Sequence, residues 1–182
     1  MSWVNTAQSR TILDIVEQKC SICHGANGEG SSAYPRLAGQ NAEYIAKQLA
    51  DFKSGRRKGT MNEMAADLTK DEMFALADYF SAKPSLSHRI RNKEFAAVGY
   101  YIYHKGNQYS DVPACETCHG VEGKGTTKLP RLAGQHKHYL SGQLQDFNER
   151  KRTNDNAIMH SIASKLTELE IAAVALYISG MQ

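Results

Sequence analysis

Apolar residues recur at three- and four-residue spacing along several stretches of the chain, and this spacing predicts helices. Residues 10–19 show the pattern, as do residues 42–53 and a later stretch from about 93 to 104. Two further helices are expected to begin at Thr69 and Thr167, because a glutamate three residues after each threonine can complete a capping box. No stretch alternates apolar and polar residues as a strand requires. The pattern therefore predicts an all-α protein.

The sequence contains two copies of one pattern. The segment Pro-Arg-Leu-Ala-Gly-Gln occupies residues 35–40 and recurs, 95 residues later, at 130–135. Near the end of each copy the spacing grows to 98, since Leu68 corresponds to Leu166. Three residues are thus inserted in the second copy after Phe147, in a polar stretch that is typical of a surface loop. Self-similarity at a fixed offset predicts a duplicated domain.

The duplication predicts two tandem domains, residues 1–83 and 93–182, joined by a linker at 84–92. The linker contains Pro84, serines and charged residues, which are typical of a domain boundary. Because the linker is short, the domains are expected to lie close together. Domains of this size are near the lower limit for a self-sufficient core and often rely on a bound metal or cofactor.

The charge distribution excludes few classes of partner. The formal net charge is only +3, and basic residues cluster at 56–58 and 150–152. We interpret these clusters as solvated loops, with a docking patch for an acidic partner as the alternative. Aromatic and basic residues do not interleave as in a nucleic-acid-binding surface. No apolar run reaches the ~20 residues that a transmembrane helix needs.

All cysteines of the chain fall in two identical motifs, Cys-x-x-Cys-His. The residues are Cys20, Cys23 and His24, and then Cys115, Cys118 and His119. This spacing is typical of c-type haem attachment, in which two thiols bond one edge of the porphyrin and the histidine binds the iron. A zinc site built from the four thiols would leave both histidines unexplained. A thioredoxin-like site would follow a strand, and no strand is predicted.

Methionine is the common second axial ligand of an electron-transferring haem. In the second copy, Met159 is the suitable candidate. In the first copy, an offset of 98 pairs Met61 with Met159, whereas an offset of 95 pairs Met64 with it. The insertion is best tolerated in the charged loop before the ligand, so Met61 is the preferred ligand and Met64 the alternative. If Met61 is the ligand, Met64 and Met73 are expected to be core residues.

With these motifs in hand, the chain resembles the di-haem cytochromes c4 over nearly its whole length. The resemblance rests on the haem motifs, the two Pro-Arg-Leu-Ala-Gly-Gln segments, the late methionines and residues 152–155. It implies two class I cytochrome c domains related by a pseudo-twofold axis. It also implies two covalently bound haem c groups with His/Met ligation, whose propionate edges face each other across the interface.

The resemblance also assigns roles to four residues by position. The carbonyl of Pro35 would accept a hydrogen bond from Nδ1 of His24, and that of Pro130 would accept one from Nδ1 of His119. These bonds would orient the two rings. Arg36 and Arg131 would contact haem propionates, because a guanidinium matches a carboxylate with two parallel hydrogen bonds.

The function implied is that of an electron carrier in a bacterial respiratory chain, not an enzyme. Expected donors are a quinol-oxidising complex, a cytochrome or a small copper protein, and the expected acceptor is a terminal oxidase or reductase. Haem attachment implies the periplasm, where peripheral membrane association is compatible with the sequence, and a signal peptide already removed. A di-haem peroxidase would need an open iron site, which a methionine in each copy disfavours. A haem subunit docked to a larger redox complex is the other alternative.

Overall fold

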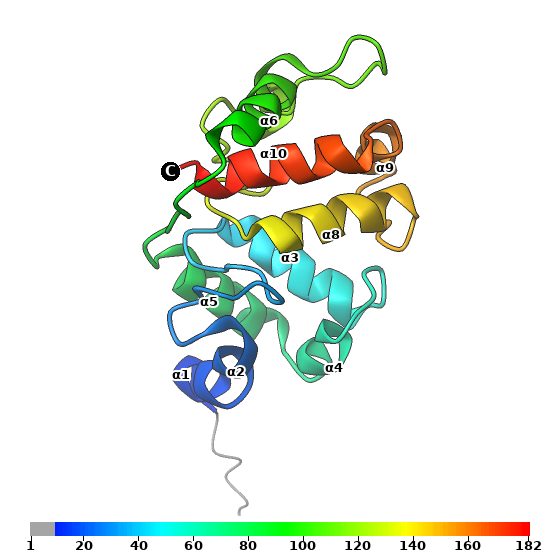
Figure 1. Ribbon diagram of the computed structural model, residues 1–182. Helices are drawn as coiled ribbons and strands as arrows, with labels where there is room; N and C mark the ends of the chain where they lie inside the picture. Colours follow the sequence, from blue (N-terminus) through cyan, green and yellow to red (C-terminus); the bar gives the residue numbers. More distant parts are fainter. Residues whose placement is uncertain (1–9) are drawn as a thin grey trace, which may run out of the picture.

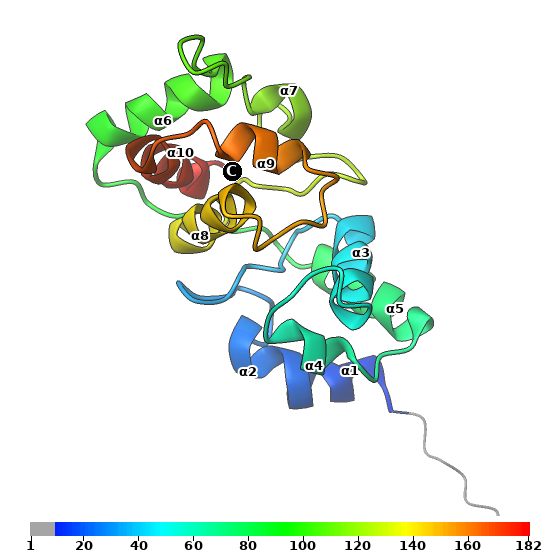
Figure 2. The ribbon, with the colours of Figure 1, turned by 90° about the vertical axis from the view of Figure 1, so that its right-hand side faces the viewer.

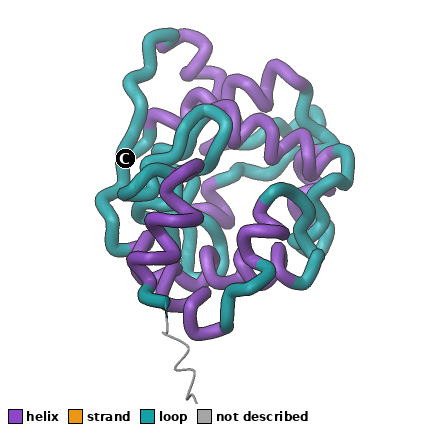
Figure 3. Tube along the Cα trace, turned by 90° about the horizontal axis from the view of Figure 1, so that it is seen from below, coloured by secondary structure: helices purple, strands orange, loops and turns teal. Residues whose placement is uncertain are grey.

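The computed structural model describes residues 10–182, which form two helical lobes in succession along the chain (Figure 1). Residues 1–9 of the first expected domain lie outside the described part. Between residues 10 and 182 the backbone contains helices and loops without a strand (Figure 3), apart from an isolated bridge between Asn107 and Val112. The expected all-α class is confirmed. No helix within the same range is long and apolar enough to cross a membrane.

The N-terminal lobe surrounds one apolar core. Its helical segments are α1 (Ile12–Ile15), a π-helical turn (Val16–Cys20), α2 (Ser21–His24), α3 (Ala42–Lys53), α4 (Met61–Ala65) and α5 (Lys70–Ser81). The larger side chains that are most deeply buried in this core come from the first helix and α5, among them Val16, Leu76 and Phe80. This core draws on residues 12–80.

The first helix differs from the expected span of 10–19. It begins after Thr11, whose side chain accepts from the Asp14 amide in a further capping box. It then continues through the π-helical turn to His24 without a break in its αR backbone. A π-helical turn rotates the residues beyond it relative to an uninterrupted α-helix, and such turns are frequent at functional sites. Here the turn ends at Cys20, the first cysteine of the haem motif.

The C-terminal lobe repeats this arrangement with one change. Its helices are α6 (Lys93–Lys105), α7 (Glu116–His119), α8 (Lys137–Asn148), α9 (Ile158–Ala163) and α10 (Glu168–Gly180). Helix α6 lies along α10 (Figure 2) and then ends at Gly106, so a loop separates it from the second haem motif. The second core draws on residues 102–181. Two cores on either side of residues 84–92 support the linker proposed there.

The capping boxes expected at the last helix of each lobe are present. Thr69 accepts from the Glu72 amide while the glutamate accepts from the threonine amide, and Thr167 and Glu170 do the same. In each case the preceding leucine is buried, so the helix start is tied to the core of its lobe.

Replacing Thr167 with alanine should lower the free energy of unfolding by about 1 kcal/mol, because the first turn of α10 loses a backbone partner. Urea denaturation followed by circular dichroism measures this loss. Thr127→Ala, at an exposed loop position, is the control. Equal unfolding midpoints for the two variants would show that the cap contributes nothing.

Candidate haem sites

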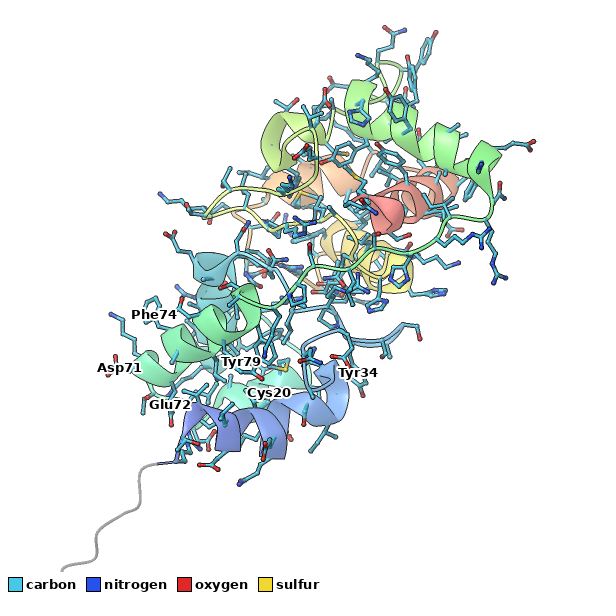
Figure 4. The ribbon with its side chains drawn as sticks, turned by 90° about the vertical axis from the view of Figure 1, so that its left-hand side faces the viewer. Cys20, Tyr34, Asp71, Glu72, Phe74 and Tyr79 are labelled. Carbon is cyan, nitrogen blue, oxygen red and sulfur yellow. The ribbon has the colours of Figure 1, made fainter. Side chains whose placement is uncertain are left out.

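Each haem motif ends in a helical turn that closes on its histidine, Ser21–His24 in the first lobe and Glu116–His119 in the second. Cys20 ends the π-helical turn on the inner side of its helix (Figure 4) and packs against the first core, while Cys115 precedes α7 and packs against the second. None of the cysteines forms a disulfide. Within residues 10–182, no three histidine, cysteine, aspartate or glutamate side chains are grouped to hold a metal ion. The described residues therefore provide no zinc cluster that joins the two motifs.

Burial keeps the inner thiol of each motif protonated. It raises the pKa of Cys20 and of Cys115 to about 11. A reactive or metal-binding cysteine has the opposite property, a lowered pKa and a stable thiolate. Burial therefore argues against a redox-active or metal-binding role for these two thiols in the folded chain.

The motif histidines are buried and oriented by the expected carbonyls. Nδ1 of His24 lies 2.9 Å from the carbonyl oxygen of Pro35, and Nδ1 of His119 lies 3.3 Å from that of Pro130. Burial lowers the pKa of both histidines, so each ring is neutral near pH 7. With Nδ1 donating to the carbonyl, Nε2 presents a lone pair on the opposite side of the ring, as an axial iron ligand must.

Each prolyl carbonyl is reached by a tight loop that only glycine permits. The amide of Gly125 donates to the His119 carbonyl at 2.8 Å, and its backbone has a φ of +68°. A Cβ atom at this position would lie 2.4 Å from the Pro130 carbonyl oxygen. Gly30 holds the equivalent position in the first domain. The glycine thus lets the loop close against the oxygen that orients the histidine.

The contacts around the candidate methionines show which first-domain methionine is equivalent to Met159. Asn62 donates to the Phe52 carbonyl at 2.5 Å, and Nδ1 of His160 lies 2.9 Å from the Phe147 carbonyl. The two phenylalanines are counterparts in the repeat. The residue before Asn62 therefore corresponds to Met159, and that residue is Met61.

Met64 does not have the core position expected of it. It is 37% exposed, whereas Ile162, its counterpart at the 98-residue offset, packs against the second core. The reason lies in α4, where the fully buried Ala65 marks the inward face. Met64 lies about 100° around the helix from Ala65, while Met61 lies about 40° from it. Met73 is buried in the first core, as expected.

A reciprocal pair of glutamines joins the two domains. Gln40 accepts from the Arg131 amide at 2.7 Å and donates to the Arg131 carbonyl at 2.8 Å. Gln135 makes the same two bonds with the Arg36 backbone, at 2.8 and 3.0 Å. The same residues of each copy thus bind the opposite copy, which is the pattern a pseudo-twofold axis produces.

Between these glutamines lie two arginines that form no ion pair within residues 10–182. Arg36 is 7% exposed and donates to the carbonyls of Leu86, at 2.6 Å, and Gly134. Nε of Arg131 is buried and has no hydrogen-bond partner. Burial lowers the pKa of both guanidinium groups and outweighs the opposing effects of Glu29 on Arg36 and Glu122 on Arg131. Carboxylates such as haem propionates would supply both the charge and the missing acceptor, so these residues fit the group.

Two further arginines were missed by the sequence interpretation. Arg57 and Arg152, assigned above to solvated loops, are each 8% exposed. Arg57 donates to the following side chains: Gln48 at 2.7 Å, Tyr139 at 3.0 Å and Gln143 at 2.6 Å. Arg152 donates to their counterparts: Gln143 at 2.7 Å, Tyr44 at 2.8 Å and Gln48 at 3.2 Å. The constant 95-residue offset of all three residue types was the signal that could have identified them.

This second network lies where α3 faces α8 at the junction of the lobes (Figure 1). Burial raises the pKa of the Tyr139 hydroxyl, but the charges of Arg57 and Arg152 outweigh burial and hold the pKa below its ordinary value. Because Arg57 and Arg152 are equivalent, the three inserted residues of the second copy lie between Arg152 and Met159.

Comparison with known proteins agrees with this geometry. The family model for cytochrome c matches residues 14–104 and again 96–182. Cytochrome c4 of Thiocapsa roseopersicina is 40% identical, over 89% of this chain and 86% of its own. A thiosulfate dehydrogenase electron acceptor of Stutzerimonas stutzeri is 38% identical, over 89% and 78%. The crystal structure of reduced recombinant cytochrome c4 from Pseudomonas stutzeri superposes with a TM-score of 0.85 at 34% identity, covering 90% of this chain and 93% of that one.

Proposed function

Since this chain belongs to the cytochrome c4 family of di-haem electron-transfer cytochromes, we propose that it passes single electrons through two His/Met-ligated haems. The proposed axial pairs are His24 with Met61 and His119 with Met159. The thioether bonds would form at the paired cysteines of each motif: Cys20 and Cys23 for the first haem c, and Cys115 and Cys118 for the second.

The observation that carries this proposal is the neutral, carbonyl-oriented histidine found in both domains. His24 and His119 each hold Nδ1 against a prolyl oxygen, which strengthens Nε2 as a ligand. Haem iron, when bound, supplies the Fe(II)/Fe(III) couple. The two apolar cores would exclude water from the haem faces. Arg36 and Arg131 would offset the negative charge of the haem propionates at the interface.

The similar surroundings of the two methionines favour a carrier over a peroxidase. A peroxidase needs an iron whose sixth position is open or easily vacated. Met61 and Met159 each directly precede a side chain that contacts the equivalent phenylalanine carbonyl, so neither site is distinguished as the open one.

We propose that the partners are other redox proteins of the periplasm. The expected donors are a quinol-oxidising complex, a cytochrome or a small copper protein, and the expected acceptor is a terminal oxidase or reductase of a respiratory chain. The relative named as an electron acceptor of thiosulfate dehydrogenase adds a dehydrogenase as a candidate donor, which also keeps stable docking to such a complex as the second candidate function.

Spectroscopy of the purified holoprotein tests the proposal. Both oxidised haems should be low-spin and show Met–iron charge transfer, and the reduced protein should not bind carbon monoxide. The protein should accept two electrons per molecule and should not turn over hydrogen peroxide. A high-spin iron in either domain, or peroxidase turnover, would contradict the assignment as a carrier.

A further inference from the structure

We propose that each domain's methionine-bearing loop is held in position by the opposite domain, through Arg57 and Arg152 acting as positioning residues. The inference rests on the proposed His/Met ligation and deepens it. The loops concerned are residues 54–60, which lead to Met61, and residues 149–157, which lead to Met159.

Each arginine is first fixed within its own domain. The Arg57 amide donates to the Asp51 carbonyl at 3.0 Å, and the guanidinium lies over the Phe52 ring, 4.6 Å from its centroid. Arg152 has equivalent partners one repeat later, with an amide bond of 2.9 Å and a ring distance of 4.5 Å. These local contacts set the direction of each side chain without holding it to the other domain.

The guanidinium groups then bind across the domain junction. Arg57 of the first domain reaches Tyr139 and Gln143 on α8, and Arg152 of the second domain reaches Tyr44 and Gln48 on α3. Both guanidinium groups are buried, and their cross-domain bonds are buried or partly buried, so water replaces a lost acceptor poorly. Each arginine lies between the end of a helix and a methionine. Movement of the opposite domain would therefore shift the loop backbone that leads to that methionine.

The second loop depends on the opposite domain more than the first. Asn154 donates to Gln48 at 3.0 Å and to Asp51 at 2.7 Å, and Lys47 donates to the Asn154 carbonyl at 3.1 Å. Three residues inserted in the second copy thus create cross-domain contacts that the first loop lacks.

The backbone of the second loop also needs this support. Ala157, directly before α9, has a φ of 64°, a left-handed conformation that an alanine side chain disfavours. Asp155 restrains the turn, since its carboxylate accepts from the Met159 amide at 2.6 Å. External contacts at Arg152 and Asn154 keep this strained segment, and therefore Met159, in one place.

The test is a matched pair of variants that each delete one hydroxyl, Tyr44→Phe and Tyr139→Phe. Hydrogen exchange on the full-length holoprotein reports the two loops separately. The Met159 amide, bound to Asp155, represents the second loop, and the Asn62 amide, bound to the Gly59 carbonyl at 3.0 Å, represents the first.

We expect a crossed result. Tyr44→Phe, in the first domain, should speed exchange at Met159 roughly two- to tenfold and leave Asn62 unchanged, because the buried Arg152 loses one hydrogen bond. Tyr139→Phe, in the second domain, should do the reverse. Effects confined to the mutated domain, equal effects on both amides, or no effect in either variant would each overturn the inference.

Asn154→Ala tests the asymmetry, with the exposed Thr153→Ala as its control. The asparagine variant should speed exchange at Met159 alone, and it should weaken Met–iron charge transfer at one haem only. Equal behaviour of the two variants would contradict the dependence of the second loop on the first domain.

The spectrum of the unmodified protein separates the two proposals. If it lacks Met–iron charge transfer, the proposed ligation is wrong, and the positioning role is overturned with it. If the charge transfer is present for both haems while the exchange pattern is not crossed, the ligation stands and only the cross-domain inference is overturned.

Discussion

Replacing Met61 with alanine should abolish Met–iron charge transfer at one haem and leave it intact at the other. A thioether ligand favours ferrous iron and raises the haem potential, so the potential of the first-domain haem should fall. The iron that loses its methionine should become open to small ligands. Absorption spectra of the oxidised protein, redox titration and carbon monoxide binding to the reduced protein measure the three effects.

Met64→Ala is the matched control, because it removes the same side chain three residues further along α4. Met64 is 37% exposed, and its truncation should leave both charge-transfer signals and both potentials unchanged. If the Met64 variant loses the signal and the Met61 variant keeps it, the equivalence inferred from Asn62 and His160 is wrong.

Replacing Gly125 with alanine should destabilise the second domain by about 2–5 kcal/mol. A left-handed backbone costs a residue with a Cβ atom about 1–2 kcal/mol, and overpacking adds about 1–3 kcal/mol. The overpacking arises because the new Cβ atom would lie 2.4 Å from the Pro130 carbonyl oxygen. Since that oxygen orients His119, spectra of the second haem should change together with the unfolding midpoint in urea.

Two other glycines separate these contributions. Gly120 also has a positive φ, of +80°, but a Cβ atom there would meet nothing within 4 Å, so Gly120→Ala should show the backbone cost alone. Gly142 lies within α8 with open space around it, and Gly142→Ala should be neutral or slightly stabilising. If Gly125→Ala is no worse than Gly120→Ala, the contact with the prolyl carbonyl is unimportant.

The features that could be predicted from sequence are local or repeated. Helix starts at Thr69 and Thr167 depend on a threonine and a glutamate three residues apart, so no distant residue is needed to recognise them. The haem motifs are local for the same reason, since covalent attachment constrains five consecutive residues. Because the chain is duplicated, a role predicted for a residue in one copy also applied to the equivalent residue in the other.

The π-helical turn before Cys20 and the loop after Gly106 were not foreseen. The first leads into a haem motif, and the second separates a helix from one. The apolar spacing of residues 10–19 is compatible with an α-helix and with one widened turn, so periodicity alone does not distinguish them.

The sequence by itself determined the helical class and the two-domain duplication, and it was sufficient to propose the residues that attach haem. Only the tertiary structure decided the role of Arg57 and Arg152, whose charge suggested solvent although both are buried between the domains. The pattern of charges along a segment predicts only how that segment would be solvated by itself. The burial of a guanidinium depends on acceptors such as Tyr44 and Tyr139, which are distant in sequence and meet it only when the two domains pack together.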